Sequence, residues 1–279
     1  MSPLRISLLT LLAMIAFAAN TVLARLALDG TSIDPASFTT VRLVSGALTL
    51  WLLVALRAGP VSGAAGNWPS ALALFAYAIT FSFAYVTLQT GVGALLLFGA
   101  VQATMILTGL WLGERLALGQ GLGLLLALGG LVGLMLPGLS APPLVGALLM
   151  LTAGVAWGIY SLLGRSGGDP LSATAANFRR AAPLAVLVSL ALLSRAELDG
   201  LGIGYAVLSG ALASGVGYAI WYTALPALTA TRAATVQLSV PVIAAVGGML
   251  LLAEPLSLRF ILAAVAILGG IALVLLGRQ

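Results

Sequence analysis

The chain has 279 residues, of which 61% are hydrophobic and only 7% are charged. A soluble domain usually carries about 25% charged residues, so the composition excludes an ordinary water-exposed surface and indicates a protein that faces lipid. Cys and His are both absent, which excludes a disulfide framework and removes the commonest metal ligand. We therefore expect no metal site and no cofactor. The net charge of +5 comes from Arg residues scattered singly at segment ends, which favours membrane orientation over nucleic-acid binding.

Ten apolar runs follow one another along the chain, joined by short turns that often contain Gly, Pro or Asp. Each is close to the roughly 20 residues that a helix needs to cross a bilayer. We expect an all-α integral membrane protein with ten transmembrane helices, since continuously apolar runs disfavour a β-barrel. In chain order the spans are 4–27, 36–57, 68–88, 92–111, 117–137, 144–164, 172–193, 201–223, 229–252 and 257–277.

The two halves of the chain are related by an internal repeat. Residues 112–136 align without a gap with residues 252–276, at a shift of 140 positions. Five helices per copy is an odd number, so the second copy must enter the membrane from the opposite side, which predicts a 5+5 inverted repeat with a binding site near the midplane. The polar and aromatic matches at this shift are Glu114 with Glu254, Phe17 with Trp157, and Arg25 with Arg165.

The predicted domains are 1–140, the first repeat, and 141–279, the second. The distribution of Arg over the short links favours cytoplasmic N- and C-termini, in a multi-pass protein of a bacterial inner membrane. Trp51, Trp68 and Trp111 would then form an aromatic belt at the inner interface. Four arginines fall inside predicted helices near their ends and do not help to decide the orientation: Arg42, Arg179, Arg180 and Arg232.

Short motifs near the ends of the fourth and ninth helices resemble those of a known family. Leu112-Gly113-Glu114 and Leu252-Ala253-Glu254 occupy equivalent places, and Pro241 precedes the second motif. Together with Tyr222-x-Ala224-Leu225, this pattern resembles the EamA family of the drug/metabolite transporter superfamily, although Val101 stands where Pro241 would align. The resemblance implies a transporter of small molecules, and the aromatic-lined helices look most like the YddG-type exporters of aromatic amino acids.

Polar side chains inside the spans are candidates to line a substrate path, because polar groups in lipid face the protein interior or a wet cavity. They are Asn20 in the first span, Gln102 in the fourth and Gln237 in the ninth. Pro241 cannot donate to the carbonyl of Gln237, so it predicts an interrupted helix of the kind that builds transporter sites. A packing kink satisfied by a neighbouring helix explains it equally well.

Aromatic residues recur at helical spacing and offer stacking and cation–π contacts to a substrate. Trp157 is the strongest candidate, since it lies within its span and matches Phe17 of the other half. Packing in the core or anchoring at the interface remains an alternative for each of them. The other aromatic candidates are Tyr77, Phe81 and Tyr85 in the third span, Phe98 in the fourth, Tyr160 in the sixth, and Tyr218 and Tyr222 in the eighth.

We expect alternating-access export of small amphipathic metabolites, most of all aromatic amino acids. The transport is expected to be facilitative, because none of the seven acidic residues lies well inside a span. A multidrug or nucleotide-sugar carrier of the same fold stays open as an alternative. A membrane enzyme or lipid-handling factor also stays open. The G-x-S-x-G motif at 164–168 does not support catalysis, however, because the chain has no His to act as the partner of the serine.

Two further features carry two interpretations each. Glu114 and Glu254 precede the fifth and tenth helices, where they either stabilise the helix N-termini or act as latches at the two membrane faces. Glycines spaced four apart, such as Gly154 and Gly158, allow close helix packing. Such faces serve either contacts within the chain or a homo-oligomer. The expected partners are therefore a small-molecule substrate and the lipid bilayer, and a second copy stays open as an alternative.

Overall fold

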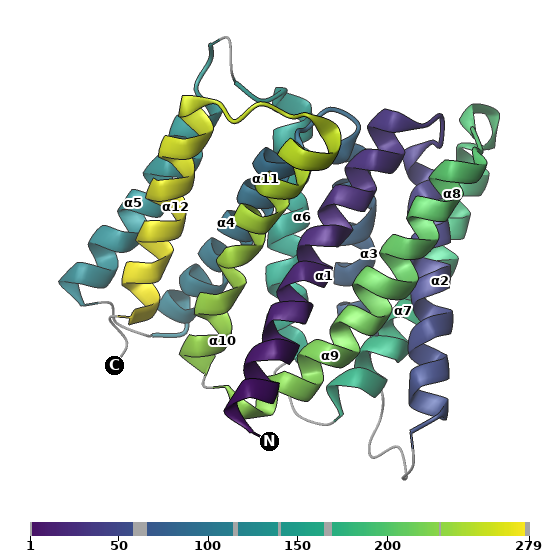
Figure 1. Cartoon of the computed structure of the whole chain (residues 1–279), viewed down its shortest axis with the longest axis horizontal. Helices are drawn as coiled ribbons and strands as arrows, with labels where there is room; N and C mark the ends of the chain where they lie inside the picture. The colour runs from purple at the N-terminus through teal and green to yellow at the C-terminus, as the bar shows by residue number, and fades with distance from the viewer. Residues whose placement is uncertain are drawn as a thin grey trace.

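A computed structural model describes residues 2–57, 66–113, 117–138, 141–164, 169–228 and 230–276. Figure 1 shows a bundle of long helices that run side by side. The helices are α1 (Pro3–Gly30), α2 (Pro35–Ala55), α3 (Trp68–Tyr85), α4 (Thr90–Trp111), α5 (Leu118–Met135), α6 (Leu144–Leu163), α7 (Pro170–Ala191), α8 (Gly200–Val207), α9 (Gly217–Ala224), α10 (Ala230–Gln237), α11 (Ser239–Leu252) and α12 (Leu258–Leu276). Short 3₁₀ turns cover Leu193–Arg195 (η2) and Leu225–Ala227 (η4), and a π-helix, η3 (Leu208–Val216), joins α8 to α9.

Among the described residues, nine helices are long and apolar enough to cross a membrane. One of them is the continuous stretch Gly200–Ala227, and another is Arg232–Leu252, which holds most of α10 and all of α11. Ten spans were expected, and α7 is the helix that falls outside the nine. It has 22 residues, enough to cross. Arg179 and Arg180, expected near a helix end, lie in its middle and lower its apolar character.

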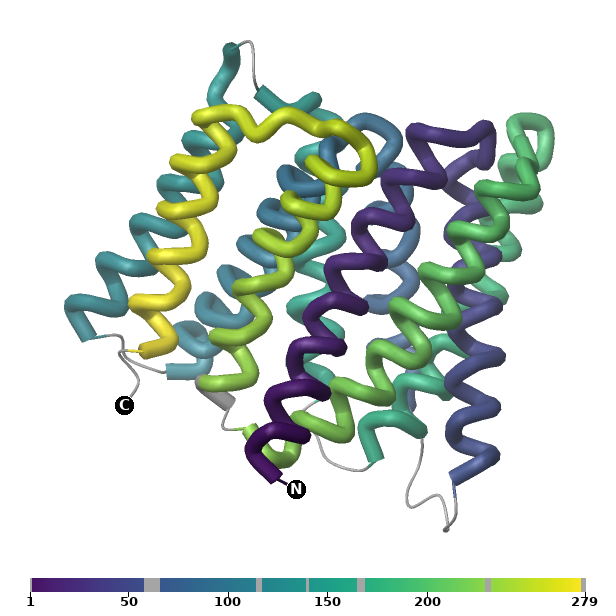
Figure 2. Tube along the Cα trace, in the orientation of Figure 1, coloured from purple at the N-terminus to yellow at the C-terminus, as the bar shows by residue number. Residues whose placement is uncertain are grey.

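The two halves of the bundle run in opposite directions. In Figures 1 and 2, α1 begins at the end of the bundle where α12 finishes, which we call the proximal end, whereas α6 begins at the opposite, distal end. Since α6 opens the second half and α1 the first, the chain has the inverted arrangement that an odd number of helices per copy requires. In both views α7 leads from the proximal to the distal end, alongside α2.

The Asp-Pro pairs of the sequence begin equivalent helices. Asp34 accepts hydrogen bonds from the backbone N–H groups of Ala36 and Ser37, at 2.9 and 3.0 Å, and α2 starts at the following proline. Asp169 caps α7 in the same way. A side-chain oxygen at the N-cap with proline at the first helical position satisfies or removes the free N–H groups of a helix start. The helix start at position 35 therefore places Arg42 two turns inside α2.

Asp169 at the proximal end also pairs with Arg57, at 2.9 Å, and accepts a hydrogen bond from the Ser172 hydroxyl, at 2.6 Å. Partial burial by itself would raise the pKa of the Asp169 carboxyl. The Ser172 hydroxyl, the positive charge of Arg57 and the Leu171 N–H outweigh that effect, so the pKa lies below its usual value.

The outer surface of the bundle is apolar, as expected of a surface that faces lipid. Large aliphatic side chains such as Leu125, Leu250 and Val265 are exposed on it. Trp51, Trp68 and Trp111 are also exposed, and their places on α2, α3 and α4 put all three toward the proximal end (Figure 1). Tryptophan prefers the membrane–water interface, so these residues mark the proximal interface.

Glycines of the predicted packing faces fall into two groups, one in close contact with a neighbouring helix and one without such a contact. A Cβ added at Gly154 would come within 2.5 Å of the Ala100 Cβ, and one at Gly158 within 2.8 Å of Thr104, so these two glycines let α6 lie close against α4. A Cβ at Gly129 or Gly133 of α5 would meet nothing within 4 Å. The first pair therefore serves contacts within the chain.

Candidate functional site

Aromatic rings from five helices meet in the interior of the bundle. Each ring lies within about 6 Å of at least one other, in tilted, stacked or edge-on arrangements that aromatic pairs favour. We call this group the aromatic cluster. Its members are Phe17 of α1, Tyr77, Phe81 and Tyr85 of α3, Trp157 and Tyr160 of α6, Phe178 of α7, and Tyr218, Trp221 and Tyr222 of α9.

Trp157 lies at the centre of the aromatic cluster. Its ring centroid is 4.8 Å from that of Tyr77, 5.1 Å from Tyr160 and 5.7 Å from Tyr218. These contacts join α3 of the first half to α6 and α9 of the second. Phe17, the residue that matches Trp157 in the repeat, lies 5.6 Å from Tyr218. The cluster thus lies between the two halves, where an inverted repeat puts its binding site.

Arg42 of α2 borders the cluster and is 2% exposed. Its guanidinium carbon lies 4.7 Å from the ring centroid of Phe81 and 5.2 Å from that of Tyr77, and its Nη2 donates to the Tyr77 hydroxyl at 2.8 Å. Within the described part of the chain, its Nε and Nη1 atoms have no hydrogen-bond partner. The sequence does not mark Arg42 as a site residue, because Arg42 lies only six residues inside its predicted span.

A polar network continues from Arg42 across the bundle. The Tyr77 hydroxyl also accepts a bond of 3.3 Å from the Asn20 amide, and the Asn20 carbonyl oxygen accepts one of 2.7 Å from the Ser209 hydroxyl. Ser209 lies in the π-helix η3, which packs against α2. A Cβ added at Gly210 would clash with the Arg42 carbonyl, so the π-helix approaches α2 closely at this level. Segments of π-helix often occur at functional sites.

The second half contributes its own polar group on the other side of Trp157. The Thr174 hydroxyl bonds to the hydroxyls of Tyr160, at 3.4 Å, and Tyr222, at 3.1 Å. Asn177 on the same helix is buried and accepts a bond from the Asn67 N–H. Asn177 follows Asp169 by eight residues, as Arg42 follows Asp34. The two halves therefore present different chemistry at equivalent places, a cation in one and an amide in the other.

Glu254 joins the two halves at the distal end. Its carboxylate accepts two bonds from the Thr90 N–H at the start of α4, at 2.8 and 3.1 Å, and pairs with Arg25 at 3.3 Å. Arg25 also donates to the carbonyls of Tyr85 and Val86 at the end of α3. Both side chains of the ion pair are 12% exposed. The sequence predicts that Glu254 either stabilises the N-terminus of the following helix or acts as a latch. Its carboxylate bonds instead to the N-terminus of α4 and to Arg25, both in the other half. Glu114 lies outside the described residues.

Among the described residues, no hydrogen bond or ring contact joins the other predicted site residues to the cluster. Phe98 and Gln102 of α4 are buried, and no ring contact within the described residues joins Phe98 to the cluster. The Gln237 amide bonds to the Ala233 carbonyl of its own helix. The helix is interrupted at Leu238, between α10 and α11, three residues before Pro241.

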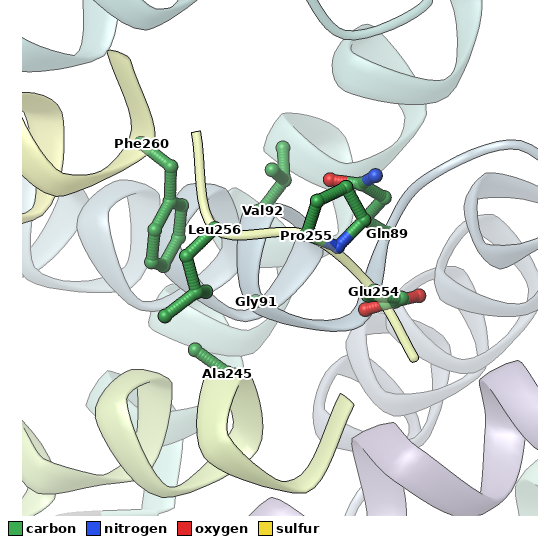
Figure 3. A pocket seen from close by; sticks show the side chains of 8 residues that line it. All are labelled: Gln89, Gly91, Val92, Ala245, Glu254, Pro255, Leu256 and Phe260. Atoms are coloured by element: carbon green, nitrogen blue, oxygen red, sulfur yellow. The ribbon is translucent and has the colours of Figure 1, made fainter. Parts of the chain in front are cut away.

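A small pocket lies near the distal end (Figure 3), with a volume of about 10 Å³ open to the centre of a water-sized sphere. A space of that size holds about one water molecule, and it adjoins the Glu254 contact rather than the cluster. We therefore do not assign it to the substrate. Its lining comes from the start of α4, from α11, from the stretch before α12 and from the first turn of α12: Gln89, Gly91, Val92, Ala245, Glu254, Pro255, Leu256 and Phe260.

The internal repeat of the sequence is also found when the chain is compared with models of protein families. The model of the EamA-like transporter family matches the chain twice, over residues 4–136 and 144–276. The chain belongs to the EamA-like transporter family. The two matches are shifted by the same 140 positions that align Phe17 with Trp157, and they leave only short stretches of the chain unmatched. This EamA-like protein is therefore a multi-pass membrane protein of a transporter family.

Comparison with individual proteins finds a relative that is similar in sequence and a solved structure that is similar in fold. The "Uncharacterized protein PA1977" of Pseudomonas aeruginosa is 60% identical over 274 residues, covering 98% of this chain and 96% of its own. A solved structure titled "Crystal structure of protein" superimposes with a TM-score of 0.65 at 20% identity and covers 96% of this chain and 98% of the other. At that identity the likeness is one of fold.

Proposed function

We propose that this EamA-like protein transports small amphipathic metabolites, aromatic amino acids first among them. The observation that supports this proposal best is the aromatic cluster around Trp157, which lies largely buried between the two halves and is bordered by the cation Arg42. Ring faces stack on an aromatic side chain and attract an ammonium group. Asn20, Tyr160 and Tyr222 add hydrogen-bonding groups at its edges.

The proposed mechanism is facilitative alternating access. The rings of the cluster contact one another directly, so substrate entry requires the two halves to separate at one end. The ion pair between Arg25 and Glu254 closes the distal end, and its breaking would open that end. No acidic residue is buried among the described residues of the spans, which supports transport without proton coupling.

The proposed membrane topology has ten crossings, with α7 as the tenth, and places both termini in the cytoplasm of a bacterial cell, inside its inner membrane. Supporting this, α1 begins and α12 ends at the proximal end (Figure 1), which requires an even number of crossings. Arg179 and Arg180 on α7 are tolerated in a crossing helix when they face the protein or reach the interface.

The test is uptake of labelled phenylalanine, tryptophan and threonine into liposomes that contain the purified protein, with and without a pH gradient. We expect saturable uptake of the two aromatic amino acids, little uptake of threonine, and no effect of the gradient. Empty liposomes are the control. Absence of protein-dependent uptake of either aromatic amino acid would contradict the substrate, and gradient-driven accumulation would contradict the facilitative mechanism.

Two other functions make different demands on the same site. A carrier of cationic drugs would have to accommodate a second positive charge next to Arg42, which like-charge repulsion in a buried site opposes. A membrane enzyme or lipid-handling factor would retain its activity in detergent, without two compartments. Competition of phenylalanine uptake by a cationic dye, and assay of the detergent-solubilised protein, separate these functions from the proposed one.

A further inference from the structure

The least satisfied polar group in the described interior is the guanidinium of Arg42. It lies seven residues past the start of α2, which at 1.5 Å per residue is about 10 Å along the helix, and the hydrocarbon core of a bilayer is about 30 Å thick. An arginine at that depth is costly unless its charge and its donors have partners. Its position two turns inside α2 follows from the Asp34 cap described above.

The surroundings of Arg42 supply only part of what the guanidinium requires. Nη2 donates to the Tyr77 hydroxyl, and the rings of Tyr77 and Phe81 lie against the charge. Nε and Nη1 together carry three of the five guanidinium N–H groups, and neither atom has an acceptor within the described residues. The ion pairs found in those residues involve Arg25 and Arg57 and leave Arg42 without a carboxylate.

Three carboxylates of the described residues are engaged elsewhere. Asp34 caps α2 and accepts from the Glu197 N–H, Asp169 pairs with Arg57, and Asp199 caps α8 through the Gly202 N–H. The open donors therefore suit an acceptor that does not belong to the described chain. A carboxylate matches a guanidinium in charge and in planar geometry, and such charge-assisted bonds are short and strong.

We propose that Arg42 binds the carboxylate of the transported molecule, whose aromatic body lies among the rings around Trp157. This inference rests on the proposed function, and it narrows the substrates to aromatic monocarboxylates, with or without an amino group. Tyr77 joins the two parts of the site, because its hydroxyl bonds to Arg42 while its ring lies 4.8 Å from that of Trp157. An amino group would lie against a ring face, as cations do.

The test compares two ligands of the same shape that differ only in charge, 3-phenylpropanoate and 3-phenylpropanamide. Inhibition of labelled phenylalanine binding by each ligand is measured on the purified full chain, and the ratio of their inhibition constants is the readout. Since the ratio is internal to each variant, a general loss of folded protein does not change it. A site that pairs with a buried charge rejects an analogue that lacks it, so we expect the carboxylate to bind about 100-fold more tightly to the wild-type protein.

Three variants make the comparison specific. In Arg42→Gln the ratio should fall to about one, and in Arg42→Lys it should recover in part, since lysine keeps the charge without the planar fork. Arg57→Gln is the matched control, because Arg57 is 59% exposed and pairs with Asp169 at the proximal end; its ratio should equal that of wild type. An unchanged ratio in Arg42→Gln would overturn the proposal and show a packing role for the side chain.

Failure of the proposed function gives a different result from failure of this inference. If wild-type protein in liposomes takes up labelled 3-phenylpropanoate but not phenylalanine, and Arg42→Gln abolishes that uptake, the carboxylate site stands and the amino-acid substrate is wrong. If phenylalanine uptake proceeds equally in wild type and Arg42→Gln, the substrate stands and the carboxylate site is wrong. Uptake of phenethylamine in preference to both carboxylates would overturn both.

Discussion

The distal contact of Glu254 gives a quantitative prediction about which end of the transporter opens. Glu254→Gln keeps the shape of the side chain and one acceptor oxygen, but it removes the negative charge that faces Arg25 and the N-terminus of α4. Hydrogen bonds to charged groups contribute about 1.5–3 kcal/mol, and an anion at a helix N-terminus adds about 0.3–2 kcal/mol, depending on burial. Since the glutamine amide retains part of these interactions, the closed distal end should lose about 2 kcal/mol.

The expected effect is an increase of about 30-fold in the population that is open at the distal end, because 1.4 kcal/mol corresponds to a factor of ten. The chain has no cysteine, so one introduced thiol reports its own accessibility. Thr21→Cys is suitable, since Thr21 is buried one turn below Arg25 on α1. The assay is the rate of labelling of this thiol by a hydrophilic maleimide, and the rate should rise about 30-fold in the Glu254→Gln background.

Asp29 provides a matched control, because it pairs with the same arginine at 3.1 Å but is 49% exposed. An exposed pair four residues apart on one helix contributes about 0.3–0.5 kcal/mol, so Asp29→Asn should raise the labelling rate by no more than about twofold. Equal labelling rates in the Glu254 and Asp29 variants would refute the reasoning. So would a Glu254→Gln protein that is labelled as slowly as its parent.

Three further predictions concern the cluster, the helix packing and the proximal end. Trp157→Ala should lower the initial rate of phenylalanine uptake at least tenfold at equal protein level, whereas Trp157→Phe, which keeps a ring, should retain most of it; equal rates would contradict the site. Gly154→Ala should lower the melting temperature in detergent, because overpacking costs about 1–3 kcal/mol, while Gly129→Ala, with open space around it, should not. The lowered pKa of Asp169 means that its carboxylate stabilises the fold above the unfolded-state pKa and that this stabilisation is lost as the pH falls through the folded-state pKa. Thermal unfolding should be measured across pH 2–7. Arg57→Met should be less stable than wild type near neutral pH, and its stability should fall less than that of wild type on acidification; parallel curves would argue against the pair.

Much of the fold follows from the sequence because the bilayer imposes simple demands. Long apolar runs must become helices when every backbone hydrogen-bonding group has to be satisfied within the segment. Among the described residues, nine of the ten predicted spans are helices that are long and apolar enough to cross a membrane. The α7 segment falls outside them because Arg179 and Arg180 occur in its middle. Apolar composition alone does not distinguish a helix shielded by α2 and α3 from one that faces lipid.

The site was predictable only in part. Helical spacing selected Tyr77, Phe81 and Tyr85 as one face, and the repeat selected Trp157, so these rings were found from periodicity. Arg42 was missed although its predicted span, which begins at position 36, starts within one residue of α2. An arginine six residues inside a span is expected to lie near its end, and the groups that show how Arg42 is satisfied, such as the Tyr77 hydroxyl, lie on other helices. Contacts between helices, such as Phe178 with Tyr218 at 6.1 Å, leave no local signature in sequence.

The π-helix η3 has a consequence for how this chain tolerates changes of length. A π-turn holds more residues than an α-turn of the same span, so η3 carries the surplus between α8 and the ring-bearing α9. Deletion of one residue within Leu208–Val216 would remove part of that surplus and let the segment relax toward an ordinary α-helix, so Tyr218 and Tyr222 would keep their places in the cluster. The same deletion within α9 would turn the residues that follow it by about 100°, given 3.6 residues per turn, and would carry Tyr222 out of the cluster. The proposed substrate site therefore depends on register as well as on side-chain identity, and in an aligned relative a gap within α9 would indicate a changed site, whereas a gap within η3 would not.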